Sequence, residues 1–532
     1  MEYGLKRLKK YSKIKMSIDI LFITPNSSKK VYQELSKDYS AIEPPTWSLL
    51  LAQSCRSRNF KVSILDANAE RLDNDTSLLK IKKLNPRLIC FVVYGQNVNA
   101  GTTNMVGATQ LANHIKKNNI ETPIIFVGSH IQALPIKTLK DEPSIDIICT
   151  NEGVYALHNL LKLKSFDEKS LININGIGFR KNGLAQLTAP EKVVPQERMD
   201  LDLPGYAWDL LPFKNKPFDL YRAPMWHAEY LEENRTPYAA IQTSLGCQFG
   251  CSFCMINIIN RNDNDEIGVA SNYSKMRFWS TEFILEEFKK LFDYGVKTIR
   301  IVDEMFLLNP KYYIPLCEKL KEYNRNDELK MWAYSRIDTI RRKNILELVR
   351  SAGIKWLCLG IESGNKNIRL EVSKGKFEDV DVEQVVNQVH NANIDIMANY
   401  IYGLPGDSKQ TINETFELSK KLNTLGWNTY AAMALPGSAL YKDAINKNYK
   451  LPEKYEDFSF HAYNTTPLPT ENLEPWEILK LRDENFIKYH SNEDFLNKIQ
   501  NKFGQKAKGN IVEMIKVKLR RKIIEEAEKN LS

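Results

Sequence analysis

The chain alternates short apolar runs with longer stretches in which apolar residues recur every three to four positions. Short runs rich in Val, Ile, Leu and Phe predict buried strands, and stretches with helical spacing predict the helices that connect them. Strands that alternate with helices of this length predict an α/β architecture with parallel sheets. The alternation comes in two blocks, so we expect two such domains.

The first block predicts a doubly wound, Rossmann-like domain over residues 15–164. Its apolar runs are 18–24, 62–65, 88–93, 124–128 and 145–149. Candidate helices lie between them at 45–59, 69–85, 104–118 and 152–164. Such domains bind ligands beyond the carboxyl ends of their strands. No Gly-x-Gly-x-x-Gly follows the first run, which disfavours a dinucleotide.

The second block predicts a partial (β/α)6, TIM-like barrel over residues 236–445. Its strand-like runs are 239–244, 298–302, 330–334, 356–360, 395–401 and 428–433. The intervening segment 281–294 carries apolar residues at helical spacing. Barrel chemistry takes place at the carboxyl ends of the strands. Polar residues stand at three of these ends: Glu304 after the second run, Ser335 and Arg336 after the third, and Glu362 after the fourth.

Two further regions complete the predicted organisation. Residues 165–235 form a connector rich in Pro, Trp and Tyr, with a hairpin around the turn Asn182-Gly183. Residues 446–532 predict a helical C-terminal region. Its last segment, 511–531, predicts a solvated amphipathic helix with a basic half, and the rules for basic helices leave contact with a membrane surface or an acidic partner open.

Three cysteines, Cys247, Cys251 and Cys254, carry the most specific chemistry of the chain. Their spacing, Cys-x3-Cys-x2-Cys, places three thiolates on one tight loop, as in sites for soft metals or iron-sulfur clusters. Three ligands leave one iron of a 4Fe-4S cluster open to a small molecule. Structural zinc is the alternative, but it needs four ligands, and the sequence has no second Cys or His pair.

This cysteine motif, with the aromatic Phe253 before its last member, resembles the signature of the radical S-adenosylmethionine (SAM) enzymes. In that family the open iron binds SAM, and an electron from the cluster cleaves it to a 5′-deoxyadenosyl radical. The resemblance implies that Phe253, Glu304, Ser335, Arg336 and Glu362 contact SAM. For each of the four strand-end residues the alternative is a local turn or cap.

The first domain resembles the cobalamin-binding domain that precedes many radical SAM barrels. The segments that carry the resemblance are 42–47, 65–70, 128–135 and 151–153. It implies cobalamin contacts by Glu43, Gln96, Asn97, Ser129, His130, Glu152 and Gly153. The motif Asp-x-His-x-x-Gly, whose His binds cobalt from below, is absent from the sequence, which leaves the lower axial ligand unassigned. His130 is alternatively a strand-end residue with satisfied hydrogen bonds.

The two resemblances together imply an enzyme with a 4Fe-4S cluster, SAM and cobalamin. It would methylate an unactivated carbon of a small or lipid-linked metabolite and draw electrons from a donor such as flavodoxin or ferredoxin. An oxidation, cyclisation or rearrangement with the same cofactors and no methyl transfer is the alternative. A non-catalytic sensor that binds cobalamin and an iron-sulfur cluster is a third hypothesis.

Composition agrees with a large enzyme of the cytoplasm. The 532 residues carry 74 basic and 65 acidic side chains, a net charge of +9 that is spread along the chain. No nucleic-acid-binding module, signal peptide or run of about 18 apolar residues is recognisable. The five other cysteines lie at apolar positions, and free thiols fit a reducing compartment.

Overall fold

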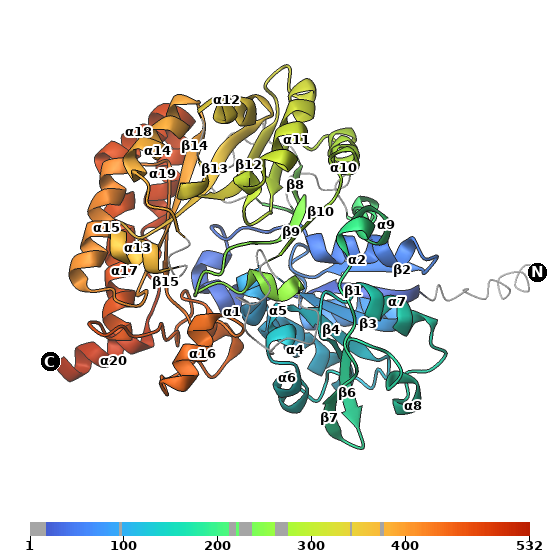
Figure 1. Cartoon of the computed structure of the whole chain (residues 1–532). Helices are drawn as coiled ribbons and strands as arrows, with labels where there is room; N and C mark the ends of the chain where they lie inside the picture. The colour runs from blue at the N-terminus through green and yellow to red at the C-terminus, as the bar shows by residue number, and fades with distance from the viewer. Residues whose placement is uncertain are drawn as a thin grey trace, which may run out of the picture.

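The computed structural model describes residues 18–94, 98–211, 220–222, 237–260, 275–340, 343–372 and 377–531. It contains two large sheets, one mainly and one wholly parallel, with helices on their faces, and a helical C-terminal region, which confirms the predicted fold class. Figure 1 shows the N-terminal sheet below the curved second sheet, with the last helices along the left-hand side.

The first sheet has the strand order β2-β1-β3-β4-β5-β6-β7. The five predicted strands are parallel and are β1 (Ile18–Thr24), β2 (Val62–Asp66), β3 (Pro86–Val93), β4 (Ile124–Gly128) and β5 (Ile147–Cys149). The main helices on its faces are α2 (Thr46–Arg56), α3 (Asn74–Leu84), α4 (Gly101–Lys117) and α7 (Val154–Lys162), with short helices α1 (Ser28–Tyr32), α5 (Ser129–Ala133) and α6 (Pro135–Asp141). This order is a doubly wound arrangement whose ligand crevice lies at the strand carboxyl ends.

The predicted hairpin forms from β6 (Ile177–Lys181) and β7 (Leu184–Leu187). Its turn places Asn182 and Gly183 at positive φ, 51° and 78°, as a tight hairpin turn requires. Strand β6 pairs antiparallel with β5, so the hairpin extends the N-terminal sheet.

The second sheet has the order β15-β14-β13-β12-β11-β8, and all its pairs are parallel. Its strands are β8 (Tyr238–Ile241), β11 (Thr298–Ile301), β12 (Lys330–Arg336), β13 (Ile354–Glu362), β14 (Asp395–Tyr402) and β15 (Gly426–Ala431). The helices around it are α10 (Thr281–Asp293), α11 (Pro310–Tyr323), α12 (Lys343–Ser351), α13 (Lys366–Glu371), α14 (Val382–Asn391), α15 (Lys409–Leu422) and α16 (Ala439–Asn446). Within the described residues β8 and β15 do not pair, so the barrel is open on one side.

Side-chain caps fix where the barrel helices begin. The side chains of Ser280, Asp381 and Ser408 each accept a hydrogen bond from the backbone N–H three residues further on. Each cap satisfies a donor that the first helical turn leaves free, which stabilises the helix by about 1 kcal/mol. The starts of these helices are therefore set by local contacts.

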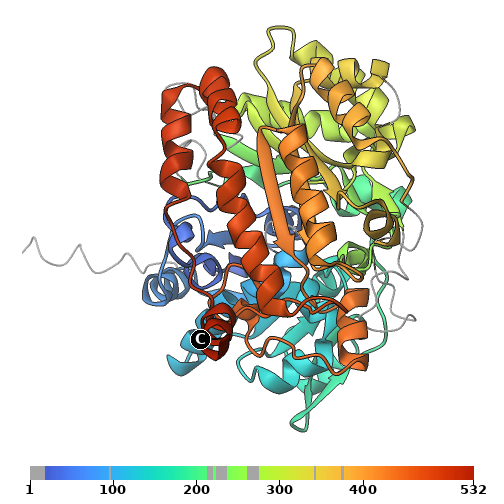
Figure 2. The same cartoon turned by 90° about the vertical axis from the view of Figure 1, so that its left-hand side faces the viewer.

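The C-terminal region folds into α17 (Pro475–His490), α18 (Glu493–Phe503), α19 (Gln505–Met514) and α20 (Lys522–Leu531). Figure 2 shows the long helix α17 running beside the edge strand β15. Tyr489 of α17 stacks on Trp427 of β15 with ring centroids 5.2 Å apart. The continuous helix predicted for 511–531 is wrong. The chain breaks between α19 and α20 because the Arg521 side chain turns inward to Asp483 and is only 3% exposed.

None of the described helices combines the length and the apolar character that crossing a membrane requires.

A buried ion pair joins the N-terminal domain to the start of the barrel. Arg277 lies on β10 (Met276–Phe278), which pairs with β9 (Ser244–Gly246), the strand that leads into the cysteine loop. Its Nη2 lies 2.7 Å from Oε2 of Glu152, and the two side chains are 7% and 1% exposed. The other Glu152 oxygen accepts a hydrogen bond of 2.6 Å from the Val194 backbone. Glu152 therefore ties the cysteine-bearing loop to the first domain.

This pair makes a prediction for stability. Replacement Arg277→Met leaves the Glu152 carboxylate buried without its cation, and we expect the free energy of unfolding to fall by about 3–5 kcal/mol. Chemical denaturation of the cofactor-free protein measures the change.

A surface pair provides the control. Lys289→Met removes an exposed partner of Glu286 and is expected to cost less than about 1 kcal/mol. An equally small loss for Arg277→Met would contradict the role assigned to the buried pair.

Candidate functional site

One cavity of about 570 Å³ lies where the barrel, the N-terminal domain and the C-terminal region meet. Its volume is within the range of about 300–1,000 Å³ that small-molecule sites occupy. The N-terminal domain contributes Tyr32, Glu43 and Asn99 to the wall. The remaining wall comes from the cysteine loop, from the inner face of the barrel and from residues after 450. A ligand in this cavity would thus touch all three parts of the chain.

The cysteine loop is held by a buried carboxylate at the end of β11. Asp303 accepts hydrogen bonds of 2.6 Å from the Thr243 backbone N–H and from the Ser244 hydroxyl, and it is 2% exposed. These bonds fix the chain just before Cys247. All three cysteines line the cavity, as the sequence predicts for cluster ligands.

Each cysteine sulfur has a nitrogen donor nearby. The backbone N–H groups of Phe249 and Ile256 lie 3.5 and 3.4 Å from the sulfurs of Cys247 and Cys254. Arg336 Nη1 lies 3.9 Å from the Cys251 sulfur. Such donors favour thiolates, and hydrogen bonds to cysteine sulfur are a regular part of iron-sulfur sites.

Burial has the opposite effect on these thiols. It raises the pKa of Cys247 to about 12 and that of Cys251 to about 11. The thiolate forms therefore need a bound metal centre at neutral pH. In the described part of the chain no three His, Cys, Asp or Glu side chains converge on a point suited to a single metal ion. Three thiols on one loop, with N–H donors around them, fit an iron-sulfur cluster.

Arg336 is fixed beside the cysteine loop by aromatic and charged neighbours. Its guanidinium lies 3.5 Å from the ring centre of Phe249 and 4.2 Å from that of Phe377, and its Nε donates to Asp338 at 2.6 Å. Stacking and an ion pair both restrict the orientation of the guanidinium. The side chain is therefore held in place before any ligand binds.

Two carboxyl groups, Glu304 and Glu362, face the same cavity. Burial raises the pKa of each to about 7, against the opposing effect of Arg300 on Glu304 and of Arg336 on Glu362. Glu362 also has a positive φ of 66°, a conformation that is rare for a residue with a side chain and that occurs often at functional sites. Both groups are thus poised near neutral pH at the barrel mouth.

The structure brings together the residues predicted to contact SAM. Phe253, Glu304, Ser335, Arg336 and Glu362 all line the cavity that the cysteines line. The Ser335 hydroxyl is also bonded to the Thr339 hydroxyl at 2.6 Å. Their contacts with SAM remain predictions.

Of the residues predicted to contact cobalamin, only Glu43 is found in the wall of this cavity within the described residues. Both its oxygens are engaged, with Arg300 Nη1 at 2.7 Å and the Tyr238 hydroxyl at 2.6 Å. Gln96 and Asn97 lie outside the described residues. The cobalamin contacts of all these residues remain predictions.

The other four candidates pack within or beside the N-terminal domain. Ser129 is fully buried beneath Gly101, and Gly153 begins α7 with a φ of 85°. The His130 ring bonds the Thr102 hydroxyl at 3.0 Å and meets the Tyr455 ring edge-on at 5.2 Å. Burial lowers the pKa of His130 to about 4, which keeps it neutral. The carboxylate of Glu152 forms the buried ion pair with Arg277.

A second cavity of about 70 Å³ lies at the carboxyl ends of β1 and β3. Thr24, Ser27, Asn68, Tyr94 and Asn104 are among the residues in its wall. This is the crevice in which doubly wound sheets bind ligands. Tyr32, Glu43 and Thr103 line both cavities, so the crevice of the N-terminal domain adjoins the main cavity.

Two important side chains were missed by sequence analysis. Asn99 lies two residues beyond Asn97, which is predicted to contact cobalamin, and its Oδ1 accepts a hydrogen bond of 3.2 Å from the Met255 backbone. Its Nδ2 lies 4.0 Å from the Cys254 sulfur. The second missed side chain is Arg300. Its charge inside an otherwise apolar strand is the sequence signal that could have indicated a buried ion pair.

Comparison with known proteins agrees with this two-domain site. The family model described as the radical SAM superfamily matches residues 241–419, and that described as the B12 binding domain matches residues 38–161. The chain is thus a cobalamin-dependent radical SAM enzyme, whose cofactors are a 4Fe-4S cluster, SAM and cobalamin.

Relatives cover most of the chain at low identity. An uncharacterized methyltransferase of Pyrococcus horikoshii is 25% identical over 454 residues, which are 84% of this chain and 88% of that protein. The anaerobic magnesium-protoporphyrin IX monomethyl ester cyclase of Cereibacter sphaeroides is 22% identical over 464 residues, 84% of this chain and 66% of that protein.

A solved structure shares the fold. It is that of the radical S-adenosylmethionine methyltransferase TsrM from Kitasatospora setae with cobalamin and a 4Fe-4S cluster bound. The TM-score is 0.58 at 15% identity, over 81% of this chain and 78% of that one.

Asn99 makes a prediction for the cluster. Replacement Asn99→Leu removes an N–H donor from the Cys254 sulfur, and such donors stabilise the reduced cluster. We expect a more negative midpoint potential in an anaerobic redox titration followed by electron paramagnetic resonance. Asn118→Leu, at the exposed end of α4, is the control and should keep the wild-type potential. Equal potentials for both variants would exclude a contact between Asn99 and the cluster.

Glu362 makes a prediction for pH. Its pKa in the folded chain, about 7, is above the ordinary value of 4.5. The stabilisation it provides is therefore complete below pH 4.5 and is lost as the pH rises through 7, with a size of roughly 3 kcal/mol. Unfolding of the cofactor-free protein at pH 5 and pH 8 should show a steeper loss of stability for wild type than for Glu362→Gln. Identical losses would show that this carboxyl group is not buried as described.

Proposed function

We propose that this enzyme transfers a methyl group to an unactivated carbon of a small or lipid-linked metabolite. One observation carries the proposal: a single cavity is lined by the three cysteines, by strand ends of the barrel and by loops of the B12 binding domain. A substrate carbon in this cavity would be within reach of both cofactor sites. When bound, the cofactors supply reductive cleavage of SAM and a transferable methyl group.

The chain's own residues would position the reactants and exclude water. Cys247, Cys251 and Cys254 would hold the cluster, and Arg336 and Glu362 would orient SAM through its carboxylate and amino groups. The ion pair of Glu43 with Arg300 would hold the N-terminal domain against the barrel at the cavity wall. A cavity that excludes water protects a carbon radical from side reactions.

The proposed domain limits separate the parts of the chain that would hold each cofactor. We infer a cobalamin-binding domain over 15–164, a connector over 165–235, the radical SAM barrel over 236–445 and a helical region over 446–532. The cluster would receive electrons from a small donor protein such as flavodoxin or ferredoxin, in the cytoplasm.

A second outcome has support from the relatives that are cyclases. The cyclase of Cereibacter sphaeroides is similar over 84% of this chain, so the same scaffold could form a ring without methyl transfer. The two functions differ in their products, since methyl donation by SAM leaves S-adenosylhomocysteine. Radical chemistry alone leaves 5′-deoxyadenosine.

The test is an anaerobic assay of the reconstituted holoenzyme with SAM, a strong reductant and cell extract as a source of substrate. We expect 5′-deoxyadenosine and S-adenosylhomocysteine as products. We also expect a metabolite about 14 mass units heavier than its precursor, because a methyl group replaces a hydrogen. Formation of 5′-deoxyadenosine without S-adenosylhomocysteine would favour the cyclase-type reaction and reject methyl transfer.

The cysteines supply the matching variant. Cys251→Ala removes one of the three proposed cluster ligands, and we expect no 5′-deoxyadenosine and a loss of cluster iron. Cys317→Ala, in a buried position of α11, should retain both. A Cys251→Ala protein that still cleaves SAM would refute the assignment of the ligands.

A further inference from the structure

The C-terminal region supplies an aromatic part of the cavity wall. The aromatic and aliphatic residues after 450 that line the cavity are Phe458, Phe460, Phe486, Phe495, Ile499, Phe503, Ile511 and Met514. Among the described residues of this part of the wall, the only Arg, Lys, Asp or Glu is Arg482 of α17. A buried cation in an apolar wall is costly unless it has partners or binds a ligand.

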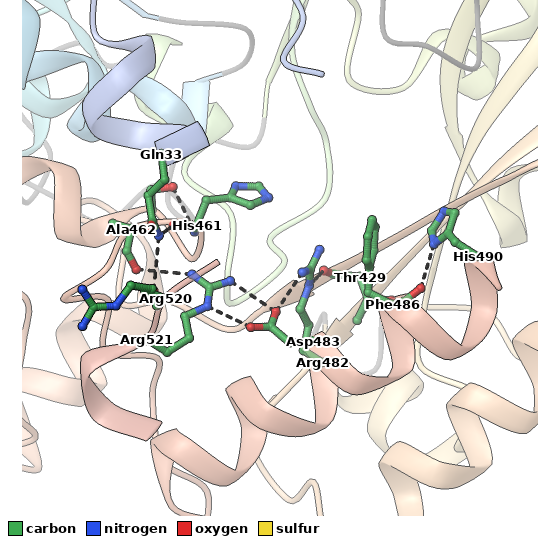
Figure 3. A network of polar contacts seen from close by, with 11 residues as sticks. Gln33, Thr429, His461, Ala462, Arg482, Asp483, Phe486, His490, Arg520 and Arg521 are labelled. Carbon is green, nitrogen blue, oxygen red and sulfur yellow. Dashed lines mark hydrogen bonds and ion pairs between the residues drawn. The ribbon is translucent and has the colours of Figure 1, made fainter. Parts of the chain in front are cut away.

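Arg482 is held rigidly and is 6% exposed. Its Nε donates to the Thr429 carbonyl of β15 at 2.9 Å, and its Nη1 donates to Asp483 at 2.9 Å. The rings of Phe460 and Phe486 lie 5.0 and 4.9 Å from the guanidinium carbon. These contacts fix the plane of the group. Figure 3 shows Arg482 between Asp483, Thr429 and Phe486.

The counter-charge of Arg482 is shared with a second arginine. Arg521 donates to both oxygens of Asp483, at 2.8 and 3.2 Å, and is 3% exposed. Two buried guanidinium groups therefore share one carboxylate, as the dashed lines in Figure 3 show. Their cluster carries an excess positive charge beside the cavity.

The neighbouring histidines do not change this excess positive charge. Burial, with Arg482 and Arg521 nearby, lowers the pKa of His461 well below its usual value. Burial also lowers the pKa of His490 to about 4. Both rings are thus neutral at physiological pH and add no charge.

One nitrogen of Arg482 is left for a ligand. Within the described part of the chain, Nη2 makes no hydrogen bond, while Nε and Nη1 are both engaged. In Figure 3 a guanidinium nitrogen points away from Asp483, toward the side on which the His461 ring lies. His461 lines the same cavity and packs against Phe460 with ring centroids 4.0 Å apart.

We propose that Arg482 binds an oxyanion group of the substrate, a carboxylate or a phosphate, while the aromatic wall holds an apolar body. The inference rests on the proposed function, because it places a substrate in this cavity. A fixed guanidinium with free N–H groups gives a strong, charge-assisted hydrogen bond to such an oxygen. The substrate would then be an amphipathic acid, anchored by its charged end and directed toward the cysteines by its apolar part.

The test uses three probes with the same ten-carbon chain: decanoate, decyl phosphate and decanol. Their dissociation constants are measured by anaerobic calorimetry on the holoenzyme, below the aggregation limits of the probes. We expect decanoate or decyl phosphate to bind at least about tenfold more tightly than decanol, as one charge-assisted bond allows. The better of the two anions identifies the oxyanion as carboxylate or phosphate.

Arg482→Gln should abolish the preference for the anion, and Arg482→Lys should retain part of it. The control Arg520→Gln removes an exposed arginine that pairs with Glu525, and it should keep the wild-type preference. If wild type binds decanol as tightly as the anions, or binds no anion at all, the proposal is wrong even if no Arg482 variant folds. An anion preference that survives in Arg482→Gln also overturns it.

The inference and the proposed function fail separately. The appearance of 5′-deoxyadenosine and S-adenosylhomocysteine without an anion preference would reject only the role of Arg482. An anion preference without S-adenosylhomocysteine would reject only methyl transfer.

Discussion

The open side of the half-barrel is the constraint on which the site depends. Since β8 and β15 do not pair in the described residues, side chains from outside the sheet must close the gap. Glu43 bonds to β8 and β11 through Tyr238 and Arg300. Tyr32 packs on His461 at 5.3 Å, and Phe460 meets Tyr430 of β15 at 5.4 Å. A bridge of contacts from both flanking regions thus spans the opening.

This closure explains why charged side chains are buried around the cavity. Arg300 has a carboxylate of its own, Glu43, so this pair is neutral. Arg482 shares its carboxylate with Arg521 and is therefore different. Neutral pairs suit walls that exclude water, whereas an excess charge suits a group that binds an anion. The same argument separates the residues that form the cavity wall from those that bind the ligand.

Much of the fold was predictable because it follows from local patterns. The strands, the hairpin turn at Asn182-Gly183 and the cysteine spacing all depend on residues close in sequence. Contacts between distant segments were not predictable, such as Glu152 with Arg277 or Glu43 with Arg300. The motifs mark these glutamates as polar residues between regular elements but do not reveal their partners. The break before α20 was missed for the same reason, since Arg521 is drawn inward by Asp483, which lies 38 residues away.

The central claim is that both cofactor sites open into one cavity between the domains. Pulsed electron paramagnetic resonance of the holoenzyme, with the cluster reduced and cobalt in the paramagnetic Co(II) state, measures the distance between the two centres. The account predicts a magnetic interaction that corresponds to less than about 15 Å, roughly the radius of gyration of one 150-residue domain. Two centres that relax independently, as if in separate proteins, would contradict it.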